Sequence, residues 1–207
     1  MVTTMRDQLA TGSTPKDDLS LEQWAAMPED ESGELVDGHL AEEELPDYVH
    51  ELIVIWLGHA FRSWLGGRGG FVGGSEAKFA VAPRRGRKPD LSVYLPGGGR
   101  PPRRGLVRLP PDVVVEVISP RPADVRGDRV EKMHDYAAFG VRWYWLIDPE
   151  ARSLEVFERG ADGRYVRALG ASGDAIAAVP GCEGLVLDLP TLWREVEALG
   201  PDEPNTD

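Results

Sequence analysis

Apolar residues recur at helical spacing in one long segment, residues 46–65. The side chains that share one face of a helix with 3.6 residues per turn are Val49, Leu52, Ile53, Trp56, Leu57 and Ala60. Gly66 and Gly67 come directly afterwards and favour the end of a helix. The pattern therefore predicts a long amphipathic helix over residues 46–65.

Shorter helices are predicted on either side of this segment. Ser20 and Gln23 match a capping box at the start of a helix over residues 19–27. A second helix is expected over residues 124–139, with an apolar face made of Val130, Met133 and Ala137. A last short helix is expected over residues 191–199.

Strand patterns fill most of the remaining chain. Asp37-Gly38 is a turn signal, and it predicts a hairpin over residues 34–40. The other expected strands are residues 70–73, 76–81, 91–95, 113–119, 143–147, 154–157, 165–168 and 184–189. Helices separated by runs of strands predict one mixed α/β (α+β) domain over residues 19–199. Residues 1–18 and 200–207 are expected to be disordered tails.

Composition narrows the class of protein. Hydrophobic residues make up 42% of the 207, which is enough for a core, and the single cysteine excludes a disulfide scaffold. The chain has no run of about 18 apolar residues that could span a bilayer, and it begins without an apolar signal segment. We therefore expect a cytoplasmic protein without a membrane partner.

Charge is distributed unevenly along the chain. Residues 1–51 hold 14 acidic and 2 basic side chains, which equals the whole net charge of −12. Residues 84–108 hold eight basic side chains, and Asp90 is the one acidic residue among them. This basic island either attracts an anionic partner such as a nucleic-acid backbone or is a solvated loop. The nucleic-acid contacts expected from it are Arg84, Arg85, Arg87 and Lys88.

Two carboxylates stand alone among apolar strand residues. Asp90 precedes the strand at 91–95, and Glu116 lies within the strand at 113–119. A carboxylate among valines is costly to bury unless it is paired or bound to a cation. If the strands are neighbours, the two carboxylates converge. With a backbone carbonyl they make a set of hard oxygen ligands suited to Mg²⁺ or Mn²⁺.

The following helix carries ionisable residues at intervals of four. Asp128, Lys132 and Tyr136 share one of its faces. A lysine near a metal-bound water can stabilise charge that develops on a phosphate. The alternative is a solvated Asp128–Lys132 pair without a catalytic role.

Together these blocks resemble the Uma-two family of restriction-endonuclease-like proteins, in the PD-(D/E)XK nuclease superfamily. The resemblance covers roughly residues 19–195. The segments that carry it are Glu34-Leu-Val-Asp-Gly, a His-containing helix, Pro89-Asp90, Glu116-Val-Ile-Ser-Pro, Asp128-(three)-Lys132-(three)-Tyr136, Gly140-Val141 and Tyr144-Trp-Leu-Ile-Asp-Pro.

The resemblance implies a restriction-endonuclease-like core, a mixed β-sheet flanked by helices, and Mg²⁺-dependent cleavage of nucleic acid, with DNA as the expected substrate. It implies that Asp90, Glu116 and the backbone of Val117 bind the metal. The supporting positions that it suggests are Glu34, Asp128 and His50. The superfamily pattern places a lysine two residues after the glutamate. Ile118 stands there, so the lysine role is carried to Lys132.

Two rival functions remain open at this level. A non-catalytic nucleic-acid-binding or regulatory module could keep the same fold, and an enzyme acting on another phosphate ester could use the same site. The resemblance also implies a homodimer. The apolar segments 143–147 and 154–157 are the surfaces expected to form its interface.

Overall fold

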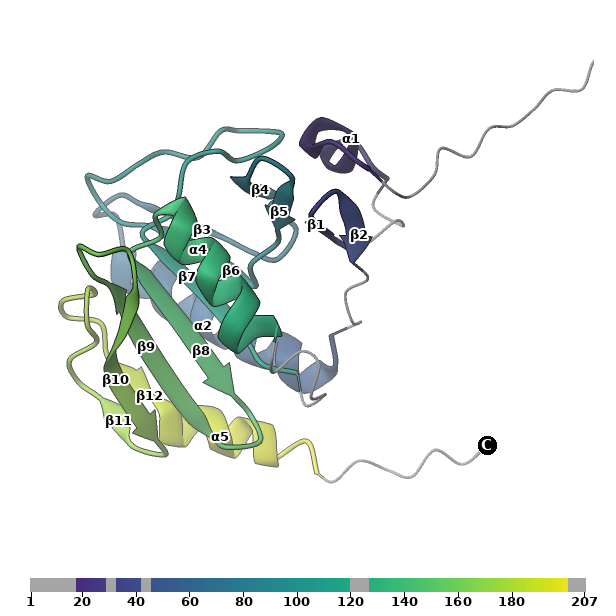
Figure 1. Cartoon of the computed structure of the whole chain (residues 1–207). Coiled ribbons are helices and arrows are strands. Elements are labelled where there is room, and N and C mark those ends of the chain that lie inside the picture. The colour runs from purple at the N-terminus through teal and green to yellow at the C-terminus, as the bar shows by residue number, and fades with distance from the viewer. Residues whose placement is uncertain (1–17, 29–32, 42–45, 120–126, 201–207) are drawn as a thin grey trace, which may run out of the picture.

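The computed structural model describes residues 18–28, 33–41, 46–119 and 127–200 of the chain (Figure 1). The predicted tails at 1–18 and 200–207 lie outside these ranges except for Asp18 and Gly200, as does the start of the predicted helix at 124–139. None of the helices in the described ranges is both long and apolar enough to cross a membrane.

A six-stranded mixed sheet forms the centre of the molecule, with strand order β10-β9-β8-β7-β6-β3. Its strands are β3 (Phe71–Gly73), β6 (Leu91–Tyr94), β7 (Val113–Val117), β8 (Trp143–Asp148), β9 (Ser153–Arg159) and β10 (Tyr165–Ser172). β7 and β8 run parallel, and every other neighbouring pair is antiparallel. The parallel pair needs a crossover, and the helical segment between the two strands supplies it.

Helices cover both faces of this sheet (Figure 1). The long helix α2 (Tyr48–Leu65) and α5 (Leu189–Glu197) pack on one face, against residues such as Val115 and Trp145. The π-helical turn η1 (Gly127–Lys132) and α4 (Met133–Phe139) lie on the other face. Because side chains alternate along a strand, β7 sends Val113, Val115 and Val117 to one core and Val114 to the other.

A smaller antiparallel sheet of order β2-β1-β5-β4 stands beside this centre. It contains β1 (Glu34–Val36), β2 (His39–Ala41), β4 (Phe79–Ala82) and β5 (Arg85–Arg87), and it packs on α1 (Leu21–Ala25). Asp37 and Gly38 join β1 to β2 with positive φ angles of 53° and 88°, as the hairpin turn requires. A further pair, β11 (Ala175–Ile176) and β12 (Leu187–Asp188), lies before α5.

The structure confirms the mixed α/β class, the capping box of Ser20 and Gln23, the 34–40 hairpin and the long helix, which Asp47 caps. It corrects three expectations. The strand β5 was not predicted, and the strand expected at 184–189 is reduced to β12. The prediction that Val130 belongs to the buried apolar face of its helix was also wrong. Val130 is 60% exposed, because the segment turns Tyr136 towards the sheet instead.

The segments expected to form a dimer interface are internal. β8 is a central strand, and its residues from Trp143 to Ile147 are buried in the two cores. Leu154 and Val156 of β9 are buried as well. These strands are therefore core elements, and an interface between two copies would have to use another surface.

Candidate active site

The topology brings Asp90 and Glu116 to neighbouring positions on two strands. β6 and β7 pair antiparallel, with Leu91 opposite Val115. Continuing this register by one residue places Asp90 opposite Glu116. Directly opposed residues of an antiparallel pair share a face and have Cβ atoms about 5 Å apart. The two residues thus lie at the same end of the β6–β7 pair, but their carboxylates contact helices on opposite faces of the large sheet: Asp90 contacts His50 of α2, and Glu116 contacts Lys132 and Tyr136.

Glu116 is buried and is held by two side chains from the helix above it. Its exposed fraction is 2%. The Lys132 ammonium lies 2.9 Å from Oε2, and the Tyr136 hydroxyl donates a hydrogen bond of 2.7 Å to Oε1. Burial raises the pKa of Tyr136 well above its usual value, and the charges of Glu116 and Glu34 raise it further. Tyr136 therefore remains a protonated donor to Glu116.

The helical segment explains how Lys132 reaches this glutamate. Lys132 is the last residue of η1 and Tyr136 is four residues later in α4, so both project from one face. Val130 lies on the opposite, exposed face. Asp128, the third residue of the predicted row, has a side chain outside the described part of the structure.

Asp90 is oriented from the other side of the sheet. Its Oδ1 lies 3.1 Å from Nε2 of His50 on α2, and its Oδ2 accepts a 2.6 Å hydrogen bond from the backbone N–H of Val117. Burial of His50 opposes its protonation, but the hydrogen bond and charge of Asp90 outweigh this effect and raise the pKa of His50. The structure therefore brings His50 and Val117 to Asp90.

Much of the basic island pairs with acidic residues of the same chain. Arg87 is 4% exposed and contacts both Glu34, at 2.5 Å, and Asp135, at 2.6 Å. Arg85 binds the same Asp135 and also Asp37. These two arginines fasten β1 and β5 to α4, so they hold the small sheet against the helix that carries Tyr136.

The acidic N-terminal region neutralises other members of the island in the same way. Arg84 contacts Asp18, and Arg108 contacts Glu22 at 2.6 Å. Lys88 lies 3.5 Å from Glu76. The uneven charge of the sequence is thus largely matched by ion pairs within the fold. Of the four expected nucleic-acid contacts, Arg87 is buried in the interior and the other three have carboxylate partners.

Asp90, Glu116 and the backbone carbonyl of Val117 are hard oxygen donors, which is the chemical type that a hard cation binds. Carboxylate oxygens and the carbonyl of Val117 are the ligands that Mg²⁺ prefers, and Mg²⁺ commonly keeps several waters besides one or two carboxylates. Within the described ranges, no group of three or more His, Cys, Asp or Glu side chains is arranged to hold a metal. Glu34 does not contribute to this candidate metal site, because its two carboxylate oxygens accept hydrogen bonds from Arg87 and from the backbone N–H of Lys88.

Comparison with known proteins decides the family. A family model described as "Putative restriction endonuclease" matches residues 19–190. The chain belongs to the Uma2 family. A crystal structure titled as a putative nuclease belonging to DUF820, from Anabaena variabilis, is similar to it with a TM-score of 0.65 and 19% sequence identity. The similarity covers 85% of this chain and 98% of the other and shows a shared fold. No curated protein matches the chain.

The sequence pattern indicated Asp90 and Glu116, because each is an isolated carboxylate among apolar strand residues. It did not indicate residues whose partners are distant in the sequence. It did not anticipate that Arg87 and Asp135 brace the helix. No local pattern indicated this, because the turn at residues 83–84 leads into β5, whose Arg-Gly-Arg sequence has the composition of a loop. It placed Tyr136 on the face of Lys132 without assigning it to Glu116.

Proposed function

We propose that this Uma2 protein is a metal-dependent endonuclease that hydrolyses nucleic-acid phosphodiester bonds. In this proposal Asp90, Glu116 and the carbonyl of Val117 bind Mg²⁺ or Mn²⁺, and Lys132 stabilises developing charge. One observation carries it. A lysine ammonium lies 2.9 Å from a buried glutamate whose cross-strand neighbour, in the continued register, is an aspartate. Membership of a family of restriction-endonuclease type supports the same reaction.

The residues of the site have separate tasks in this reaction. His50 and the N–H of Val117 fix the orientation of Asp90, and Tyr136 fixes that of Glu116. The Lys132 ammonium supplies a fixed positive charge where negative charge grows on the phosphate oxygens. When bound, the metal ion would polarise the phosphate and lower the pKa of a water molecule.

The direct test is cleavage of labelled DNA and RNA by the full chain. We expect cleavage with Mg²⁺ or Mn²⁺, none with EDTA, and none by Asp90→Asn under any of these conditions. Asp162→Asn is the matched control, because Asp162 is an exposed carboxylate in the β9–β10 turn. Activity that survives in Asp90→Asn, or that ignores EDTA, would overturn the assignment.

We further propose that the substrate is DNA and that the protein acts as a homodimer in the cytoplasm. Comparison of DNA and RNA in the cleavage assay tests the first point. Light scattering tests the second, since one chain has a mass of 22.7 kDa. A mass of one chain at high concentration would contradict the dimer.

A second candidate, a non-catalytic nucleic-acid-binding or regulatory module, is favoured by one observation. Every oxygen of Asp90 and Glu116 already has a partner within the protein: His50, the Val117 N–H, Lys132 and Tyr136. A site satisfied in this way needs no metal for its stability. Calorimetric titration with Mn²⁺ separates the two functions. Binding that Asp90→Asn abolishes supports the nuclease, and absence of binding supports the module.

A further inference from the structure

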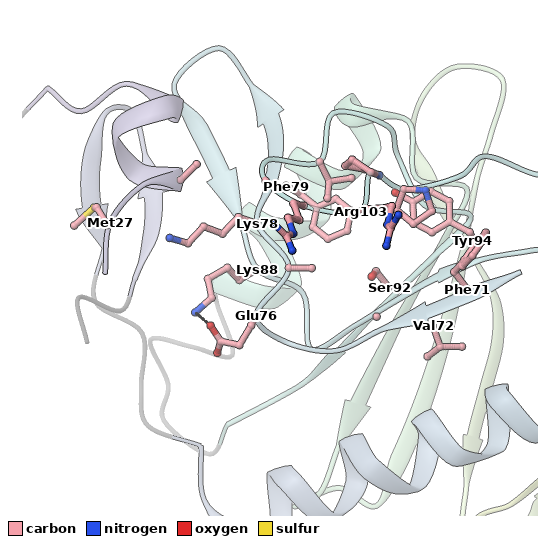
Figure 2. Close-up of a pocket in the computed structure, with 18 of the residues that line it drawn as sticks. Met27, Phe71, Val72, Glu76, Lys78, Phe79, Lys88, Ser92, Tyr94 and Arg103 are labelled. Atoms are coloured by element: carbon pink, nitrogen blue, oxygen red, sulfur yellow. Dashed lines mark ion pairs between the residues drawn. The ribbon is translucent and has the colours of Figure 1, made fainter. Parts of the chain in front are cut away.

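A cavity of about 590 Å³ opens between the small sheet, the β3–β6 edge of the large sheet and the loop at residues 101–107 (Figure 2). Its size falls within the range of small-molecule sites, which is about 300–1,000 Å³. Ser92 of β6 lines it, and so does Lys88 just before that strand. Asp90 lies between these two residues in the sequence, so the cavity adjoins the candidate active site.

The charge of the cavity is positive although the whole chain is acidic. Its charged lining residues are Lys78, Lys88, Arg103 and Arg104, opposed by Glu76. Lys78 donates a hydrogen bond to the carbonyl of Trp24, and Lys88 pairs with Glu76, so both are anchored at one end (Figure 2). Arg103 and Arg104 are exposed, and neither has a carboxylate partner among the described residues. Two exposed guanidinium groups in the lining favour an anionic ligand, and phosphate in particular.

The other end of the cavity is aromatic. Phe71 of β3 lies directly opposite Tyr94 of β6 in the strand register, and both line the cavity (Figure 2). The Tyr94 hydroxyl donates to the carbonyl of Leu109, so this ring is fixed in place. Phe71 is 41% exposed, and the guanidinium of the loop residue Arg100 lies over its ring, 5.6 Å from the centroid, so a stacked base would share the ring with this arginine or displace it. Aromatic surfaces of this kind stack with nucleobases regardless of their sequence.

Aromatic rings at one end and exposed guanidinium groups in the lining match the two halves of a nucleotide. We propose that the cavity binds one unpaired nucleotide of the substrate strand, with its base on Phe71 and its phosphate on Arg103 and Arg104. This inference rests on the proposed nuclease function and adds the substrate class to it. Ser92 and Asp90 are two residues apart on an extended chain, which is about 7 Å. In this placement the substrate strand continues along β6 from the nucleotide beside Ser92 towards Asp90.

The dimensions of the cavity set the form of the nucleic acid. A base that is paired and stacked in a duplex cannot enter it, and a base must be single-stranded or flipped out to do so. We therefore assign single-stranded nucleic acid, or an unpaired stretch within a duplex, as the preferred substrate.

Binding is measured by fluorescence anisotropy with Ca²⁺ in place of Mg²⁺, so that cleavage does not interfere. The probes are a labelled single strand of about 12 nucleotides, the matching duplex, and a free deoxynucleoside monophosphate as competitor. The variants are Phe71→Ala and Arg103→Ala/Arg104→Ala. Their matched controls are Val186→Ala, an exposed apolar residue elsewhere, and Arg62→Ala/Arg164→Ala, two exposed arginines that do not line the cavity.

We expect the single strand to bind at least 10-fold more tightly than the duplex. Phe71→Ala should weaken single-strand binding at least about 5-fold, which corresponds to the removal of one stacked base. The double arginine variant should reduce the salt dependence of log K by about 0.7 for each phosphate that the two arginines no longer neutralise. The control variants should bind as the wild type does.

Three results would overturn the inference: duplex binding as tight as single-strand binding, wild-type single-strand affinity in both cavity variants, or binding of the free monophosphate without binding of the strand. Because these measurements need no cleavage, they are independent of the nuclease test. A protein that binds single strands through the cavity but never cleaves would refute the nuclease function alone.

Discussion

Lys132 of η1 and Glu116 of β7 form an ion pair, with the ammonium nitrogen 2.9 Å from Oε2. The glutamate is almost completely buried. The lysine is 16 residues away from the glutamate in sequence and on a different layer of the fold. The residue two positions after the glutamate is Ile118, which is buried in the core beneath α4 and carries no charge. The positive charge near Glu116 therefore comes from the helix and not from the strand.

The first prediction concerns this charge. Lys132→Met should lower metal-dependent cleavage by about 100-fold or more, which is the scale seen when one charge-stabilising donor is removed. The affinity for Mn²⁺, measured by calorimetry, should change little, because the two carboxylates remain. Initial cleavage rates at saturating metal provide the test. A wild-type rate in Lys132→Met, when Asp90→Asn is inactive, would show that the lysine has no role in the reaction.

The same pair gives a prediction for stability in EDTA. Lys132→Met removes the ammonium from the buried Glu116 carboxylate and leaves the hydrogen bond from Tyr136, so the free energy of unfolding should fall by about 1–3 kcal/mol. Adding Glu116→Gln to that variant removes the buried negative charge and should restore part of this stability. Urea unfolding of the single and double variants measures the effect. A double variant that is less stable than Lys132→Met would contradict the explanation.

Arg87 should matter far more for stability than its neighbour Arg84. Arg87→Met removes the arginine from the buried Glu34 and leaves Asp135 with Arg85 as its remaining arginine partner, and breaking a buried pair costs about 3–5 kcal/mol. Arg84→Met is the control, because its side chain is 55% exposed and exposed ion pairs contribute at most about 1 kcal/mol. Equal urea midpoints for the two variants would show that Arg87 does not fasten the small sheet to α4.

Local patterns in the sequence predicted most of the central sheet but little of the small one. The alternation of Trp143, Trp145 and Ile147 placed β8 correctly, because these three side chains share one face of the strand and pack in one core. The other face is buried too, so the strand is apolar throughout its length. β5 is Arg-Gly-Arg, which has the composition of a loop. It becomes a strand only because Glu34 and Asp135, 53 and 48 residues away from Arg87, neutralise its buried arginine.

In the candidate site, too, some residues could be predicted from local sequence patterns and others could not. Asp90 and Glu116 are recognisable because isolated carboxylates in apolar strands require an explanation, and their pairing follows from strand adjacency. The inward face of α4 was not predictable from hydrophobicity, because Asp135 and Tyr136 point inward while Val130 points out. Polar partners, not apolar periodicity, set the rotation of that helix.

Close packing in the small sheet leads to a further prediction. A Cβ atom at Gly86 would lie 2.2 Å from the ring of Trp24, whose indole N–H is fixed by a 2.9 Å hydrogen bond to the carbonyl of Gly33. Gly86→Ala should therefore overpack this contact and lower the free energy of unfolding by about 1–3 kcal/mol. Gly74→Ala is the control, because nothing lies within 4 Å of its Cβ position. Equal thermal midpoints of the two variants would contradict the packing argument.

The last prediction concerns pH and the contact between His50 and Asp90. The pKa of His50 is raised above its usual value of 6.5, because the hydrogen bond and charge of Asp90 outweigh the effect of burial. A raised pKa in the folded state means that the folded protein holds the proton more tightly than the unfolded chain does. The contribution to stability is thus fully present below pH 6.5, and it disappears as the pH rises through the higher, folded-state pKa.

Urea unfolding in EDTA from about pH 6 to about pH 8 measures this contribution, within the range where histidines titrate. The free energy of unfolding of the wild type should fall across that range relative to His50→Gln, which cannot take up the proton. His59→Gln, at an exposed position on the same helix, should keep the wild-type dependence. If His50→Gln retained the full slope, the slope would have to come from other groups. The Asp90 carboxylate would then be positioned by the Val117 N–H, with no contribution from a charged imidazole.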